Sequence, residues 1–230
     1  MISIIVPTLN EAEVISEFIE QTCNVMNQLS KKYELLVVDD NSQDNTWKIV
    51  KSICKKNKCV RVLRRKNNYG LSFAIVDGFR KAKGDFFVVM DADLQHPPKI
   101  IPIMIDKLTN FEFVVCSRNS YASINMFRRY ISYIINFFVR KFLCLKIRDP
   151  MSGFFAIRKG VFNNSKKRIK PRGYKIMLEL LIKSQTNSVC EIPFVFQKRF
   201  SGKTKANVTV FLDLLVQFVD NFLFKFKSCF

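Results

Sequence analysis

The run Phe86-Phe-Val-Val-Met-Asp91-Ala-Asp93-Leu-Gln95-His-Pro97-Pro98 joins a short apolar segment to two acidic residues and a pair of prolines. An uninterrupted apolar segment of this length is typical of a buried strand. Side chains alternate along a strand, so Asp91 and Asp93 are expected on the same side, with Gln95 as a third oxygen donor. Three such oxygens suit a hard divalent cation, Mg²⁺ or Mn²⁺, which often shares its ligands with substrate phosphates. The sequence therefore predicts Asp91, Asp93 and Gln95 as ligands of a metal that accompanies a nucleotide.

A second interpretation of the same run needs no metal. Asp is favoured where a turn opens and at the N-terminal cap of a helix, and Pro is favoured in the first helical turn. On this interpretation Asp91 and Asp93 only start the helix expected near Pro97. Because the two acids follow directly after an apolar strand, the metal site is favoured over this alternative.

The composition limits the classes of protein to which the chain can belong. Its 230 residues are enough for one good core, and no linker rich in Gly, Ser or Pro divides them. Lys and Arg outnumber the acids 38 to 19, and the net charge of +19 predicts attraction to nucleic acid, phosphate-bearing substrates or an anionic membrane. Seven Cys without a CxxC spacing, and no leader pattern at Met1, predict a reduced protein that faces the cytosol.

Apolar segments alternate with helical patterns along the first half of the chain. Strands are expected at residues 2–6, 35–38 and 60–63, from Phe86, and at 113–116. Helices are expected from Asn10, from Asn41 through Lys56, at 71–83 and at 100–108. This alternation predicts the α/β class, with a Rossmann-like, mostly parallel sheet flanked by helices.

Polar residues follow three of the expected strands. They are Pro7 to Glu11, Asp39-Asp40 and Asp91-x-Asp93, and ligands of open α/β sheets bind at the edge where strands end. Asp40, with Asp39 beside it, can accept hydrogen bonds from the N–H groups of a nucleobase, while a metal neutralises the charge of a diphosphate. The alternative for Asp39 and Asp40 is a turn and helix cap, which Asp-Asp-Asn-Ser satisfies well. Neither GxGxxG nor a P-loop is present, so a dinucleotide enzyme or an ATPase is disfavoured.

Further short stretches occur in order between Met1 and about Lys205. They are Val6-Pro-Thr-Leu-Asn-Glu11, Val38-Asp-Asp-Asn-Ser42, Arg64-Arg, Gly70-Leu-Ser, Met90-Asp-Ala-Asp-Leu-Gln-His-Pro-Pro98, Cys116-Ser-Arg118, Asp149-Pro-Met-Ser-Gly-Phe-Phe155, Gly173-Tyr-Lys-Ile-Met-Leu-Glu179 and Glu191-Ile-Pro193. With these stretches the chain resembles the polyprenol (dolichyl) phosphate mannosyltransferases of glycosyltransferase family 2. The resemblance implies a GT-A-type fold, GDP-mannose as donor, dolichyl phosphate as acceptor, Mg²⁺ or Mn²⁺, and inversion at the sugar carbon. The product, dolichyl phosphate mannose, would serve protein glycosylation and GPI anchor synthesis.

The resemblance also implies roles for particular residues. The catalytic set would be Asp91, Asp93, Arg118 and Arg128. The nucleotide-sugar site would comprise Pro7, Thr8, Asn10, Glu11, Asp39, Asp40, Ala92, Arg199 and Lys205. Arg118, with Arg128 or Arg129, would hold the acceptor phosphate. Arg199 and Lys205 lie in a basic, glycine-containing loop that either closes over the donor diphosphate or is an ordinary exposed turn.

The expected chemistry needs no general base. A lipid monophosphate has a second pKa of about 6, so its oxygen is already ionised at neutral pH. His96 is accordingly expected to pack against neighbouring side chains or bind water beside the predicted metal ligands. Asp149, Ser152 and Gly153 form either a turn beneath the sugar or simply a tight turn. Glu179 belongs either to the catalytic pocket or to the exposed stripe of an apolar helix.

Two segments are candidates for membrane contact. Residues 125–143 mix aromatic and basic side chains, and residues 208–226 are mostly apolar with one polar stripe of Asp213, Gln217, Asp220 and Asn221. Neither contains about 18 uninterrupted apolar residues, so neither is expected to span a bilayer. We therefore predict a catalytic domain at 1–205 and a C-terminal amphipathic interfacial helix at 206–230, which docks on a membrane or a partner. The alternative for both segments is packing in the core.

The predicted location is the cytosolic face of the endoplasmic reticulum membrane, where small transmembrane subunits are possible partners. Relatives often have Gly-Gly after the Arg118 position, whereas this chain has Asn119-Ser-Tyr-Ala-Ser. The resemblance therefore does not predict the conformation of the acceptor loop. Two alternative functions fit parts of the sequence. A dolichyl phosphate glucosyltransferase using UDP-glucose would share the nucleotide site. A basic nucleic-acid-binding module would explain the charge, but no recognisable binding motif accompanies it.

Overall fold

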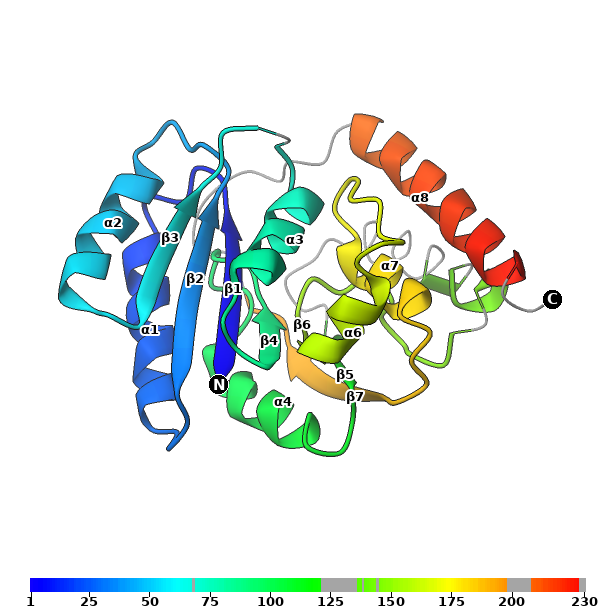
Figure 1. Ribbon diagram of the computed structural model, residues 1–230, viewed down its shortest axis with the longest axis horizontal. Helices are drawn as coiled ribbons and strands as arrows, with labels where there is room; N and C mark the ends of the chain where they lie inside the picture. The colour runs from blue at the N-terminus through cyan, green and yellow to red at the C-terminus, as the bar shows by residue number, and fades with distance from the viewer. Residues whose placement is uncertain (68, 121–135, 138, 144, 198–207, 228–230) are drawn as a thin grey trace.

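The computed structural model describes residues 1–67, 69–120, 136–137, 139–143, 145–197 and 208–227 (Figure 1). In chain order its elements are β1 (Ile2–Thr8), α1 (Ile15–Asn27), β2 (Tyr33–Asp39), α2 (Thr46–Lys56), β3 (Val60–Arg64), α3 (Leu71–Lys81), β4 (Phe86–Val89), η1 (Pro98–Ile100), α4 (Ile101–Lys107), β5 (Phe113–Ser120), β6 (Phe155–Arg158), α6 (Lys159–Ser165), α7 (Ile176–Lys183), β7 (Val189–Val195) and α8 (Val208–Lys227). The five expected strands and four expected helices of the first half are all confirmed.

The strands form one seven-stranded sheet in the order β3-β2-β1-β4-β6-β5-β7. Neighbours are parallel except for β6, which runs antiparallel to both β4 and β5. The predicted mostly parallel α/β sheet is therefore confirmed. The antiparallel strand was not predicted, because β6 pairs with segments that lie far from it in the chain.

Helices cover both faces of the sheet. On one face Ile2, Ile4 and Val6 of β1 pack with residues of α1, α2 and α4. On the other face Ile5 packs with residues of α3, α6 and α7. The alternation follows from the two-residue period of a strand, and all four side chains are at most 1% exposed. Figure 1 shows α1 and α2 on the left of β1 to β3, and α3 on their right.

The first helix begins later than the sequence suggested, at Ile15 rather than near Asn10. Asn10 has a φ of 55°, so the backbone there is left-handed and cannot continue into a helix. The backbone N–H groups of Asn10, Glu11 and Ala12 instead donate to side chains of the loop after β2 and of the first residue of α2. The acceptors are Ser42 Oγ at 2.9 Å, Thr46 Oγ1 at 2.9 Å and Asp44 Oδ2 at 2.8 Å. These bonds tie together the two loops at the carboxyl edge of β1 and β2.

Helix α8 packs against α7 with polar side chains directed inward. Gln217 and Asn221 are 4% and 0% exposed, and Asp220 Oδ2 lies 2.8 Å from the Nζ of Lys183 in α7. Apolar side chains point outward, with Val219 and Leu223 53% and 52% exposed. Within the described residues, no helix is both long and apolar enough to cross a membrane. The C-terminal helix is thus held by its polar side and presents apolar residues to the outside.

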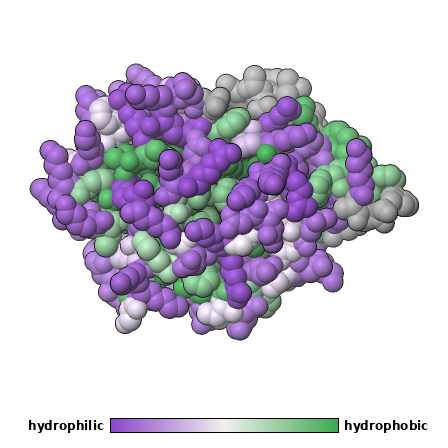
Figure 2. Space-filling view, in the orientation of Figure 1, coloured by the Kyte–Doolittle hydropathy of each residue, from purple (hydrophilic) through white to green (hydrophobic). Residues whose placement is uncertain are grey.

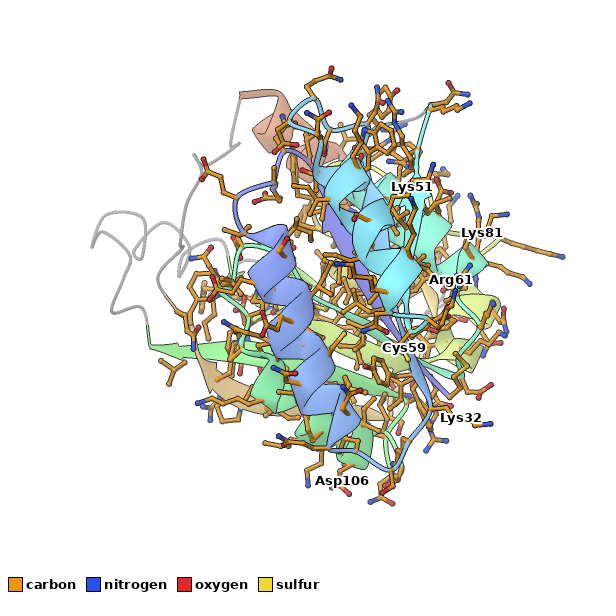
Figure 3. The ribbon with its side chains drawn as sticks, turned by 90° about the vertical axis from the view of Figure 1, so that its left-hand side faces the viewer. Lys32, Lys51, Cys59, Arg61, Lys81 and Asp106 are labelled. Carbon is orange, nitrogen blue, oxygen red and sulfur yellow. The ribbon has the colours of Figure 1, made fainter. Side chains whose placement is uncertain are left out.

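Basic residues lie along one side of the molecule, away from α8. Figure 3 shows Lys32, Lys51, Arg61 and Lys81 on the same side of the view, from the turn before β2, from α2, from β3 and from α3. Arg61 pairs with the buried carboxylate of Glu34. Part of the net positive charge therefore belongs to solvated helix and turn residues.

Candidate active site

The three polar segments predicted at one edge of the sheet do lie together. Strand β1 stands between β2 and β4 and runs parallel to both. Thr8 is in register with Asp39, and Ile5 is in register with Val89 at the end of β4. Since parallel strands end at the same edge, the ends of all three strands converge there. Pro7 and Thr8 are buried at the end of β1, and Ala92 is 3% exposed after β4.

Asp39 and Asp40 are buried and already engaged within the protein. Asp39 accepts hydrogen bonds from Ser42 N at 3.0 Å and from the hydroxyls of Ser42 and Thr8 at 2.6 and 3.2 Å. Asp40 accepts from Gly70 N at 2.6 Å and forms an ion pair with Arg65. Asp39 therefore makes the hydrogen bonds expected of a turn, and its place in a nucleotide site stays a prediction.

Arg65 was not identified from the sequence as the partner of Asp40. It is 5% exposed, and its Nε also lies 3.0 Å from Asp77 Oδ2. A usable signal was present, because Arg64-Arg follows the next strand, and the pairing of Asp39 with Arg64 places that pair of arginines beside the two acids. A buried carboxylate is stabilised by such a cation.

Asp91 and Asp93 differ in exposure. The Asp91 side chain is 40% exposed, whereas Asp93 is 4% exposed and accepts from Gln95 N at 3.1 Å. Strand β4 ends at Val89 and Leu94 has a φ of 62°, so the strand period that suggested a shared side does not extend through these residues. Gln95 Nε2 donates to the backbone oxygen of Gln197 at 3.2 Å, which leaves its amide oxygen as the atom able to bind a metal.

These donors fit a metal that the protein holds only in part. Two carboxylates and one amide oxygen are hard ligands of the kind that Mg²⁺ and Mn²⁺ prefer. Across the described part of the chain, no group of three or more His, Cys, Asp and Glu residues could form a complete cage. An ion at Asp91 would therefore take its other ligands from water or from substrate phosphates.

His96 is a packing residue, as expected. It is 4% exposed, its ring stacks on Phe154 with centroids 4.9 Å apart, and its Nδ1 accepts the backbone N–H of Asp91 at 3.0 Å. Burial lowers the pKa of His96, so the imidazole is neutral at pH 7. The ring therefore holds the backbone of Asp91 through this hydrogen bond.

Arg118 and the turn at residues 149–153 complete the site beside Asp91. The guanidinium of Arg118 binds Asp149 with two bonds, Nε to Oδ2 at 2.7 Å and Nη2 to Oδ1 at 3.0 Å. Ser152 Oγ donates to the backbone oxygen of Cys116 at 2.6 Å, which anchors the turn to β5. A Cβ at Gly153 would lie 3.4 Å from Asp91 Oδ2, so the turn backbone runs directly against that carboxylate.

Lys175 also lies in this site, although the sequence did not single it out. Its Nζ donates to the backbone oxygen of Met151 at 2.7 Å. Burial lowers the pKa of Lys175, and Arg118 lowers it further, whereas Asp149 and Asp91 raise it. The ammonium therefore stands among the other charged groups of the site. Its place just before α7, in the stretch Gly173-Tyr-Lys-Ile-Met-Leu-Glu179, was the available signal.

Glu179 is not on an exposed stripe, so that interpretation was wrong. It is 1% exposed and accepts from Lys183 Nζ and from Lys170 N, each at 2.6 Å. Its second oxygen accepts from Gln217 Nε2 of α8 at 3.3 Å. Glu179 thus joins α7 to α8. The predicted residues Arg128, Arg129, Arg199 and Lys205 lie outside the described residues.

Comparison with known proteins identifies the family. Residues 3–165 match the family described as Glycosyl transferase family 2. The chain belongs to this family. It is 40% identical over 212 residues to the dolichol-phosphate mannosyltransferase of Pyrococcus furiosus, covering 89% of this chain and 58% of that protein. It is 36% identical over 238 residues to the dolichol-phosphate mannosyltransferase of Saccharomyces cerevisiae, covering 98% of this chain and 88% of that protein.

Solved structures of glycosyltransferases share the fold of this family 2 chain. Glucosyl-3-phosphoglycerate synthase from Mycobacterium tuberculosis in complex with UDP aligns with a TM-score of 0.73 at 17% identity, over 96% of this chain and 80% of that one. The same enzyme with Mn²⁺, UDP-glucose and phosphoglyceric acid also aligns at 0.73. The predicted GT-A-type fold and the resemblance to dolichyl phosphate mannosyltransferases are both confirmed. The chain spans 58% of the length of the Pyrococcus relative.

Proposed function

We propose that this chain transfers mannose from GDP-mannose to dolichyl phosphate with inversion, yielding dolichyl phosphate mannose. The observation that carries the proposal is the meeting of Asp91, Asp93 and Arg118 at one sheet edge in a chain whose similarity to two dolichol-phosphate mannosyltransferases extends over most of its length. The acids would hold a metal ion at the donor diphosphate, and the arginine would bind the acceptor phosphate. Membership of family 2 disfavours the alternative of a nucleic-acid-binding module.

Asp91, Asp93 and Gln95 would hold Mg²⁺ or Mn²⁺ at the donor diphosphate. When bound, the ion would neutralise the phosphate charge that grows as the sugar departs. The M. tuberculosis synthase with Mn²⁺ and UDP-glucose supports a divalent ion on this fold. Pro7, Thr8, Asn10 and Glu11 would line the nucleoside end with Asp39, Asp40 and Ala92, and Arg199 and Lys205 would contact the diphosphate.

The acceptor phosphate would need orientation rather than activation. Its oxygen is already anionic, so a base is not required, and the neutral, buried His96 is consistent with this. Arg118 is aimed by Asp149 and would hold that phosphate with Arg128. The bidentate pair fixes the guanidinium plane, so the arginine need not reorganise when the two anionic substrates meet.

Residues 206–230 would dock the catalytic domain of residues 1–205 on the lipid surface that carries the acceptor. We define the outer face of α8 as Val216, Val219, Phe222, Leu223 and Phe226, which are 38% to 58% exposed. Figure 2 shows hydrophobic residues along the upper right edge, where Figure 1 places α8. Phe137 and Phe142 extend this surface at 50% and 53% exposure, and Phe142 contacts Phe218 with ring centroids 6.2 Å apart.

Lysines border this surface, which favours a bilayer with anionic lipids. Lys225 and Lys227 close the last turn of α8, and Lys141 Nζ lies 5.9 Å from the ring centre of Phe137. The proposed location is the cytosolic face of the endoplasmic reticulum membrane.

Binding to phosphatidylcholine–phosphatidylserine vesicles tests the surface. The double variant Leu223→Ser, Phe226→Ser should lose binding, whereas Ile103→Ser, on α4 and 45% exposed, should keep it. If the wild-type chain does not bind protein-free vesicles, the result would instead support docking on a membrane subunit.

A transfer assay tests the function. Purified chain with Mn²⁺ and a polyprenyl phosphate is given radiolabelled GDP-mannose or UDP-glucose, and the labelled lipid is extracted. Label from GDP-mannose is the expected result. Label from UDP-glucose alone would replace the proposal with the glucosyltransferase, and no lipid label from either donor would overturn it.

A further inference from the structure

Lys175 is a half-buried cation without a carboxylate partner among the described residues. Within this part of the chain its ammonium contacts only the backbone oxygen of Met151, at 2.7 Å, and no ion pair within 4.0 Å is formed. An ammonium carries three N–H donors, so this contact uses one of them. A charge partly removed from water is stabilised by a counter-ion, which Lys175 does not find within this part of the protein.

The surroundings of Lys175 indicate the sign and kind of the missing partner. Asp149 is already bound by Arg118 through both of its oxygens. Asp91 interacts with Lys175 only over a longer distance, as one of the charges that favour its protonated form. Lys175 and Arg118 therefore stand with Asp149 and Asp91, and among the described residues the Lys175 ammonium makes hydrogen-bond contact with neither acid. Its remaining N–H donors, beside the guanidinium of Arg118, suit an anion with several oxygens, such as a phosphate.

Helix α8 holds the backbone of Lys175. Gln217 is 4% exposed, and its Nε2 donates to the Lys175 backbone oxygen and to Glu179 Oε2, both at 3.3 Å. Glu179 is in turn paired with Lys183, which also binds Asp220 of α8 at 2.8 Å. The position of Lys175 therefore depends on contacts with a helix that the sequence places about forty residues away.

We propose that Lys175 binds a substrate phosphate beside Arg118, and that Gln217 is a positioning residue through which α8 holds Lys175 in place. The proposal rests on the proposed function for the identity of the substrates. The phosphate belongs either to the donor diphosphate or to the acceptor monophosphate. Because α8 also carries the outer apolar face, the helix at the membrane and a cation at the reaction site form one connected unit.

Calorimetry with two probes separates the two phosphate sources. GDP with Mn²⁺ reports the donor site, and farnesyl phosphate reports the acceptor site. Lys175→Met should weaken binding of one probe by about tenfold, which corresponds to about 1.4 kcal/mol, and leave the other unchanged. Lys175→Arg should retain most of that affinity. The control Lys170→Met removes the same charge from a side chain that is 69% exposed and should change neither affinity.

Gln217→Ala tests the positioning role. It should weaken the same probe as Lys175→Met, by about threefold, and raise KM for the matching substrate more than it lowers kcat. Circular dichroism melting confirms that each variant is folded. If folded Lys175→Met binds both probes as the wild type does, Lys175 does not bind a substrate phosphate. If folded Gln217→Ala binds both probes as the wild type does, Gln217 is not a positioning residue. Wild-type chain that binds both probes without transferring mannose would refute the proposed function alone, since the calorimetric test of Lys175 still applies.

Discussion

The acidic ends of β2 and β4 lie at the same edge of one sheet, yet their carboxylates are used differently. Asp39 is fully buried, and three hydrogen bonds from Ser42 and Thr8 satisfy it. The Asp91 side chain is 40% exposed and faces a turn whose glycine approaches it closely. The comparison teaches that an acid after a strand can either be enclosed while it holds loops together or stay accessible to solvent. The exposure of the carboxylate distinguishes the two.

The largest expected effect is on activity, at the exposed acid. Asp91→Asn keeps the shape of the side chain and removes the charge that a metal requires, so kcat/KM for mannose transfer should fall about 100- to 1,000-fold. The melting temperature should stay close to that of the wild type, because the side chain is partly in water. Steady-state kinetics and thermal melting check the two parts. Full activity in this variant would remove the metal-assisted mechanism.

The next effect is on stability, at the buried acid. Asp39→Ala leaves the Ser42 N–H and two hydroxyls without their acceptor, so the free energy of unfolding should fall by about 2–4 kcal/mol. Urea denaturation measures it. The control Asp85→Ala removes an acid whose side chain is 70% exposed and should cost less than about 1 kcal/mol. Equal losses in both variants would show that burial does not distinguish these acids.

The smallest effect is a pH dependence at Asp220. Its hydrogen bond with Lys183 holds the pKa of Asp220 below its ordinary value of 3.8. A carboxyl whose folded pKa is lowered stabilises the protein above its unfolded pKa, and that stabilisation disappears as pH falls through the folded pKa. The stability difference between wild type and Asp220→Asn should therefore be constant above about pH 5 and shrink below 3.8. A difference that grows on acidification would contradict the assignment.

The regular half of the fold follows from local sequence, and the remainder does not. Apolar segments such as Leu35 to Val38 identify strands without reference to distant residues, since a strand buried on both faces is apolar throughout. The partner of Asp40 is Arg65, which follows β3, and Glu179 is held in part by Gln217 of α8. Such pairings depend on which elements become neighbours. The direction of the polar stripe on α8 was unpredictable for the same reason, because its inward direction depends on partners such as Lys183 and Glu179 on α7.

The position of β6 has a consequence for synthesis of the chain on the ribosome. Within the described residues, strand β5 pairs with β6 and β7, and β6 also supplies the second neighbour of β4. Until residues 155–158 emerge, the edges of β4 and β5 that β6 will join therefore stay unpaired in the nascent polypeptide. Such edges are sites of self-association, so delays between β5 and β6 should make this stage of translation the one most dependent on chaperones.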